Sequence, residues 1–226
     1  MRPPLRTLLC AATLSLATAA GILSYQRRAE AYPKPSLFPI SWQFKFQHSV
    51  PKRIAVQSPG ETAPKAYWYM TFSVTNTSES EQDFLPTFDL FTRDGKEIHA
   101  EKNVPAAVYD EIKKRERNRA LEPLEKIAGR LRIGEDQTRD GVAIWAEPST
   151  RMGTFHIYVS GLSGESVLMK DGEEIQIKDW TKVSEEDRKK QSILRKTLDL
   201  TYQVTGDETH PEEHPANPVT EEWVMR

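Results

Sequence analysis

Apolar and polar residues alternate along residues 66–75, AYWYMTFSVT, and this stretch constrains the fold strongly. Neighbouring side chains of a β-strand point to opposite faces, so the alternation predicts a strand with one face turned toward a core. Tyr67 and Tyr69 fall on the other face, together with Thr and Ser residues. The residues that we expect to be buried on the apolar face are Trp68, Met70, Phe72 and Val74.

Other stretches also have strand character, and turn signals separate them. Two Asp-Gly pairs, Asp94-Gly95 and Asp171-Gly172, predict hairpin turns because glycine tolerates the positive φ that such turns need. The other predicted strands are residues 41–47, 52–57, 86–92, 141–147, 152–162 and 193–206. Many short strands with turns between them predict an all-β fold, which we interpret as an immunoglobulin-like antiparallel β-sandwich.

A helical insertion is expected near residues 103–128. Val104, Val108 and Ile112 recur at four-residue spacing, and Pro105 suits the first turn of a helix. Residues 113–119 are rich in Lys and Arg, which indicates either a solvated helix face or a contact with an anionic polymer or lipid headgroup. Residues 121–133 fit a helix at their start and a strand at their end.

The N-terminal residues 1–31 have the layout of an export signal. Arg2 and Arg6 precede a run without charges, residues 7–25, that is rich in Leu and Ala. This segment is either a cleaved signal peptide or a retained membrane anchor, because 19 uncharged residues are about long enough to span a bilayer. Both interpretations place the remainder outside the cytoplasm: in the periplasm, in the extracellular space or anchored to the inner membrane facing outward. The main domain is then residues 32–206.

Residues 207–226 form an acidic, proline-rich segment that we interpret as an irregular tail. Its HPEEH motif offers His210 and His214, ligand types that suit zinc or copper. A metal site normally needs a rigid backbone and further ligands, so a solvated tail without metal is the preferred interpretation. The tail ends in Trp223 and Met225, which we expect to pack on the domain or on a partner.

Several classes of function have no support in the sequence. Four of the 31 Lys and Arg residues and one of the 33 Asp and Glu residues precede residue 32, so the remainder carries a net charge of −5. This balance argues against nucleic-acid binding, which requires a basic face. The single cysteine, Cys10, lies in the N-terminal segment, so the main domain has no thiol chemistry. Glycine-rich phosphate loops and a G-x-S-x-G serine motif are also absent.

The order of several motifs resembles small immunoglobulin-like accessory domains of secreted bacterial proteins. The matching residues in this chain are Val74-Thr75-Asn76-Thr77, Asp94-Gly95 and Gly134-Glu135, within residues 65–165. Together with YPKPSLFPISW, DGVAIWAEP and the terminal WVMR, the layout is similar to an uncharacterised family of exported planctomycete-type bacterial proteins. That resemblance implies the fold and export, and it implies no activity.

These observations predict a non-catalytic exported module of the cell envelope that has a binding or structural role and no cofactor. Its expected partner is an unidentified protein or an envelope polymer, with possible attachment to a membrane through the N-terminal segment. Candidate partner-binding side chains are Tyr67, Tyr69 and Trp223, because aromatic rings with polar tips favour interfaces. The favoured alternative for the two tyrosines is packing beneath the helical insertion. The alternative function is a secreted hydrolase or carbohydrate-active enzyme whose carboxylates converge from separate loops.

Overall fold

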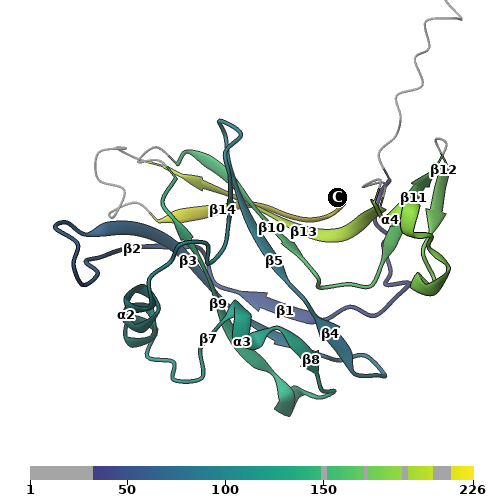
Figure 1. The fold of residues 1–226 in the computed structure, drawn as a ribbon, viewed down its shortest axis with the longest axis horizontal. Coiled ribbons are helices and arrows are strands. Elements are labelled where there is room, and N and C mark those ends of the chain that lie inside the picture. The colour runs from purple at the N-terminus through teal and green to yellow at the C-terminus, as the bar shows by residue number, and fades with distance from the viewer. Residues whose placement is uncertain (1–32, 149–151, 171–172, 190–192, 206–214) are drawn as a thin grey trace, which may run out of the picture. The chain divides into compact units, whose positions relative to one another are not determined.

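The computed structural model describes residues 33–148, 152–170, 173–189, 193–205 and 215–226. Residues 34–226 form one compact unit that is built mainly of antiparallel β-sheet (Figure 1), so the prediction of an all-β fold is confirmed. The uncharged run at residues 7–25 and the HPEEH motif at residues 210–214 lie outside the described residues. Within the described residues, no helix is both long and apolar enough to cross a membrane.

The first sheet has the strand order β1-β3-β9-β7, and β2 also pairs with β3. All its pairings are antiparallel except the short pairing of β7 with β9. The bounds of its strands are β1 Lys45–His48, β2 Lys52–Val56, β3 Lys65–Thr75, β7 Glu122–Pro123 and β9 Arg139–Ala146.

The second sheet has seven strands in the order β12-β11-β13-β10-β5-β6, and β14 also pairs with β13. Its strands are β5 Thr87–Thr92, β6 Glu97–His99, β10 Thr154–Ser160, β11 Ser166–Lys170, β12 Glu173–Gln176, β13 Ile193–Val204 and β14 Ala216–Met225. A separate small pair consists of β4 Gln82–Phe84 and β8 Gly129–Leu131. Gly95 has a φ of 82° in the turn between β5 and β6, which confirms the first predicted hairpin.

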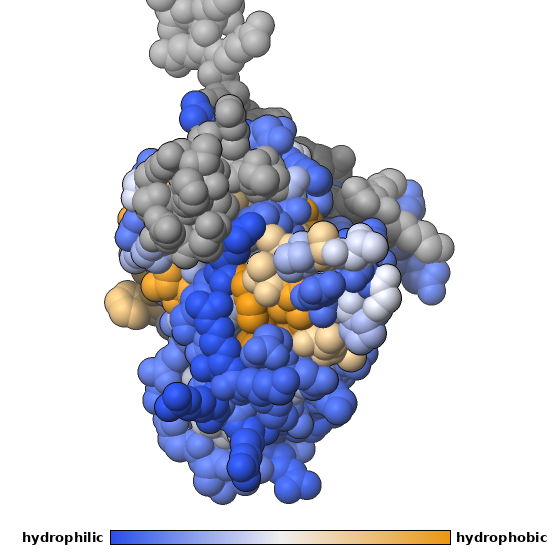
Figure 2. Space-filling model, turned by 90° about the vertical axis from the view of Figure 1, so that its left-hand side faces the viewer, coloured by the Kyte–Doolittle hydropathy of each residue, from blue (hydrophilic) through white to orange (hydrophobic). Residues whose placement is uncertain are grey.

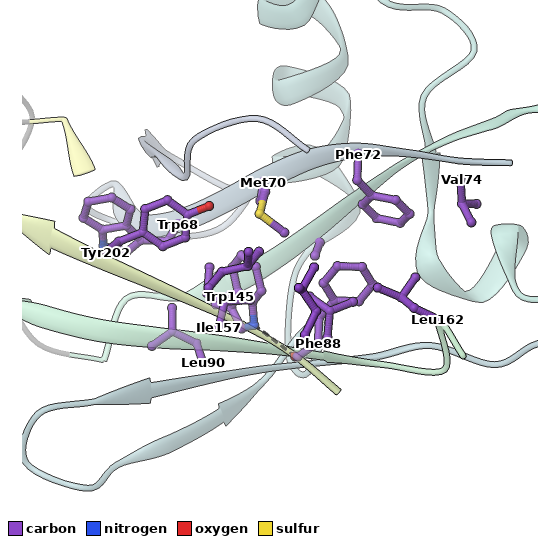
Figure 3. Close-up of a cluster of buried hydrophobic side chains, with 14 of the residues drawn as sticks. Trp68, Met70, Phe72, Val74, Phe88, Leu90, Trp145, Ile157, Leu162 and Tyr202 are labelled. Atoms are coloured by element: carbon purple, nitrogen blue, oxygen red, sulfur yellow. Dashed lines mark hydrogen bonds between the residues drawn. The ribbon is translucent and has the colours of Figure 1, made fainter. Parts of the chain in front are cut away.

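The main hydrophobic core lies between the two sheets (Figure 3). Phe72 on β3 stacks on Phe88 on β5, with ring centres 4.8 Å apart, and Trp68 lies 5.7 Å from Phe155 on β10. The indole of Trp145 donates a hydrogen bond of 3.1 Å to the carbonyl of Phe88, so this polar atom is satisfied inside the core. The predicted burial of Trp68, Met70, Phe72 and Val74 is confirmed.

Three α-helices and two 3-10 helices complete the described chain. Their bounds are α2 Ala106–Glu116, α3 Leu124–Ile127, α4 Glu185–Lys189, η1 Glu135–Gln137 and η2 Trp180–Lys182. The four-residue helix α3 precedes strand β8, as the ambiguous pattern of residues 121–133 predicts. Pro105 is the residue before the first helical residue of α2, and its extended backbone suits this position.

A second apolar cluster lies between α2 and the outer face of the first sheet. Val108 and Ile112 of α2 pack in the same cluster as Tyr67 and Tyr69 of β3. The hydroxyl of Tyr69 donates a hydrogen bond of 2.6 Å to Glu116, and burial together with this bond raises the pKa of Tyr69. The interpretation of the two tyrosines as a partner-binding surface is therefore wrong, because α2 covers their rings. The alternative, packing beneath the helical insertion, is what the structure shows.

The interpretation of residues 207–226 as an irregular tail is wrong for residues 216–225, which form strand β14. This strand pairs antiparallel with β13, from Ala216 opposite Val204 to Met225 opposite Lys196. Strands β10 and β11 pair with one edge of β13, and β14 pairs with its other edge, since the backbone N–H of Lys196 donates to Glu165 while that of Arg195 donates to Arg226. The register of the pairing between β13 and β14 shifts between Thr220 and Pro218. Proline is tolerated beside such irregularities in a sheet. Met225 is buried and Trp223 packs against the core, as predicted.

Candidate binding pocket

The loop that follows β6 carries an unusual backbone conformation. Glu101 and Asn103 both have a φ of 61°, in the left-handed region that non-glycine residues seldom adopt. The backbone N–H of Glu101 donates a hydrogen bond of 2.7 Å to the carbonyl of Ile144, and that of Ala100 donates one of 2.9 Å to Phe88. The loop is thus fixed to both sheets. Strain of this kind persists only where the surroundings impose it, and it is common at ligand sites.

The carboxylate of Glu101 is held in a defined position. It accepts a hydrogen bond of 2.6 Å from the backbone N–H of Leu124, at the start of α3, and the backbone of Glu125 is a second donor. Burial raises the pKa of Glu101, and the charge of Glu125 acts in the same direction. The two backbone donors lower the pKa, but the net shift is upward because desolvation is the largest effect.

A pocket of about 310 Å³ opens beside this carboxylate. Its walls come from the loop, the first turn of α2, the start of α3 and strand β9. The apolar lining residues are Val104, Pro105, Ala106, Tyr109, Pro123 and Ile144. Glu101, Glu125 and Lys126 are the charged lining residues. Figure 2 shows the side of the molecule that carries α2, where hydrophobic side chains gather in a hollow bordered by hydrophilic ones.

The ring of Tyr109 forms a fixed wall of this pocket. Its hydroxyl donates a hydrogen bond to the carbonyl of Leu121, and Lys113 Nζ lies 5.5 Å from the ring centre. Small-molecule sites are mostly apolar, with few polar groups that fix orientation and with volumes of ~300 to 1,000 Å³. The pocket is at the small end of that range. It therefore suits a small, largely apolar group that carries a hydrogen-bond donor for the carboxylates.

Three side chains on the β5–β6 hairpin could offer ligand atoms to a metal ion. The ligand atoms of Asp89, Glu97 and His99 all lie within 4.8 Å of one another. His99 Nδ1 is 2.7 Å from Asp89 Oδ1, and Arg226 Nη2 is 3.8 Å from Glu97 Oε1. A guanidinium so close to Glu97 opposes the binding of a cation, and His99 and Asp89 already satisfy each other. We assign no metal to this group.

The other residues singled out in the sequence lie away from the pocket. Trp223 packs partly buried beneath Lys196, whose Nζ lies 5.2 Å from the indole centre. His210 and His214 lie outside the described residues.

The basic residues after position 112 line an open groove at the end of α2, and the acidic residue Asp110 borders this groove. Within this run, Lys114 pairs with Glu111 and Arg115 donates to the carbonyl of Arg53, an arrangement typical of a solvated helix face.

Sequence reasoning missed Glu101 and Tyr109. Neither residue belongs to a motif, and Glu101 is separated from its partner Leu124 by 23 positions. The sequence does contain one signal for this site, namely a predicted strand that ends shortly before a predicted helix begins. Loops between such elements often carry binding residues.

Comparisons of the chain with protein-family models, with curated proteins and with solved structures give no match.

Proposed function

We propose that the chain is a non-catalytic exported binding module of the cell envelope, built on an immunoglobulin-like β-sandwich. The support for the fold is the pair of packed, mainly antiparallel sheets with a shared core. The support for export is the charge pattern of residues 1–31. The observation that carries the binding role is the apolar pocket beside Glu101, whose loop has a strained backbone.

The lining of the pocket specifies the ligand class. Aliphatic and aromatic walls favour an apolar body, and Glu101 and Glu125 outnumber the one cation, Lys126. A carboxylate has more acceptor positions than its two backbone donors use, so Glu101 can accept a further hydrogen bond. The ligand is therefore a small apolar group that bears an amine or another donor, either as a free molecule or as the side chain of a bound peptide.

Calorimetric titration with three matched probes tests this proposal. Cyclohexylamine, cyclohexanol and cyclohexanecarboxylate share one apolar body and differ in their polar group. We expect the amine to bind most tightly and the carboxylate most weakly. The substitution Ala106→Trp at the rim should abolish binding of the amine, whereas Lys102→Trp, an exposed residue outside the lining, should preserve it. Equal affinity for the three probes, or binding that survives Ala106→Trp, would contradict the proposal.

The alternative function, a hydrolase or carbohydrate-active enzyme, has one specific observation in its favour. Glu101 and Glu125 line the same pocket, and the raised pKa of Glu101 is a property of general acids. The two backbone N–H groups that hold Glu101 favour a positioning role instead. Assays with p-nitrophenyl glycosides and esters separate the two functions, because only an enzyme would show turnover that Glu101→Gln abolishes.

A further inference from the structure

An exposed apolar loop precedes the first strand. Leu37, Phe38 and Ile40 are 96%, 81% and 60% exposed, and Pro39 lies between them. Three large apolar side chains so close together and open to water are unusual on a soluble domain, and such patches mark contact sites. The loop joins β1 from the end of the molecule where β12 lies (Figure 1), and β12 carries Ile175, another exposed apolar residue.

The loop is fixed at its first end by a buried ion pair. Lys196 Nζ lies 3.1 Å from Glu165 Oε2, and these side chains are 3% and 1% exposed. Both partners also bind the backbone of Ser36: its N–H donates to Glu165 at 2.7 Å, and its carbonyl accepts from Lys196 at 3.2 Å. Burying two charges is costly unless hydrogen bonds satisfy them, and Ser36 supplies two of those bonds.

The second end of the loop is fixed to the turn after β10. The backbone N–H of Gly164 donates to the carbonyl of Trp42 at 3.0 Å, and that of Phe44 donates to Leu162 at 2.9 Å. A Cβ atom at Gly164 would lie 2.5 Å from Ser41 Oγ, so this close approach requires glycine. The exposed apolar side chains thus project from an anchored loop.

We propose that this loop inserts into the surface of the lipid bilayer that holds the N-terminal segment. The proposal rests on the proposed export of the chain and takes residues 7–25 as the retained membrane anchor, one of the two interpretations of that segment. Only 11 residues lie between Tyr25 and Leu37, and an extended chain over those 12 steps spans at most ~40 Å, so the loop lies within reach of the same membrane surface.

The chemistry of the loop suits an interfacial position. Aliphatic and aromatic side chains enter the boundary between headgroups and acyl chains, as in amphipathic membrane anchors. Pro39 has no backbone N–H, so one fewer donor loses its water when the loop inserts. The insertion is driven by apolar burial, and we expect zwitterionic lipid to suffice.

Site-specific fluorescence in the full chain tests the proposal. In a Cys10→Ser background, which removes the native cysteine, Phe38→Cys and Val219→Cys each receive a nitrobenzoxadiazole label. Val219 is the matched control because it is apolar and 53% exposed but lies on β14, outside the loop. Both chains are reconstituted into phosphatidylcholine vesicles, with and without nitroxide-labelled lipid, and flotation measures their association with the vesicles.

We expect the emission of the label at position 38 to shift to shorter wavelength and to be quenched by nitroxide lipid, while position 219 shows neither change. If both chains float with the vesicles but position 38 stays as accessible to iodide as position 219, the loop does not insert and only this proposal fails. If neither chain floats, the proposed membrane placement of residues 7–25 fails as well. A shift that appears without vesicles and grows with protein concentration would identify a second copy as the occupant and would overturn the proposal.

Discussion

Glu101 and Leu124 are joined by a hydrogen bond of 2.6 Å in which the backbone N–H of Leu124 donates to the carboxylate. This contact links the strained loop after β6 to the start of α3 and aligns the carboxylate with the pocket. Because Glu101 also lines the pocket, the protonation of its carboxylate reports on the environment of the pocket.

The raised pKa of Glu101 predicts a pH dependence of stability. The folded protein binds the Glu101 proton more tightly than the unfolded chain does, so this group costs stability as the pH rises from its usual pKa of 4.5 to the raised value. The cost is absent below 4.5 and is complete above the raised pKa. Relative to Glu101→Gln, whose side chain does not titrate, the native protein should lose stability across that window. Urea unfolding at several pH values measures the difference, and a difference that grows in favour of the native protein would contradict the assignment.

Phe72 tests the packing between the two sheets. Its ring is 4% exposed and stacks on Phe88, so Phe72→Ala should lower the free energy of unfolding by about 3 to 5 kcal/mol, the usual cost of deleting a core phenylalanine. Leu85→Ala is the matched control, because Leu85 is 68% exposed and should change stability by less than about 0.5 kcal/mol. A loss below about 1 kcal/mol for Phe72→Ala would mean that β3 turns its other face to the main core.

Strand β14 should contribute measurably to stability. Truncation after Thr220 removes the partners of residues 196–200 of β13 and should lower the melting temperature. Met225→Ala should cost about 2 to 5 kcal/mol, because Met225 is only 4% exposed, whereas Glu222→Ala at an exposed position should cost less than about 0.5 kcal/mol. A truncated chain that melts at the native temperature would show that β14 does not dock in solution.

The export prediction has a direct genetic test. Alkaline phosphatase fused after residue 226 should be active, because the enzyme needs an oxidising compartment to form its disulfides, and β-galactosidase at the same point should be inactive. The matched control lacks residues 1–31, and in it the two activities should reverse. An inactive phosphatase fusion of the complete chain would refute export.

The strands of the core could be predicted from the sequence because their pattern is local. Alternation along β3 assigns Trp68 and Phe72 to one face whatever the neighbouring strands are. Strand β14 could not be predicted in this way: Pro218 and two glutamates obscure its pattern, and it forms by pairing with the edge of β13 that faces away from β10. The pocket could not be predicted either, since its geometry depends on the contact of Glu101 with a backbone group 23 positions away.

The central claim is that the pocket beside Glu101 binds a small apolar amine. Methyl NMR during titration with cyclohexylamine tests this claim most directly. Ile144 lines the pocket, while Ile157 lies in the main core and serves as an internal control with the same type of methyl group. We predict that the δ1 methyl signal of Ile144 shifts with a saturating dependence on amine concentration, that the signal of Ile157 stays in place, and that Ala106→Trp removes the response. A signal of Ile144 that moves no more than that of Ile157 would contradict the claim.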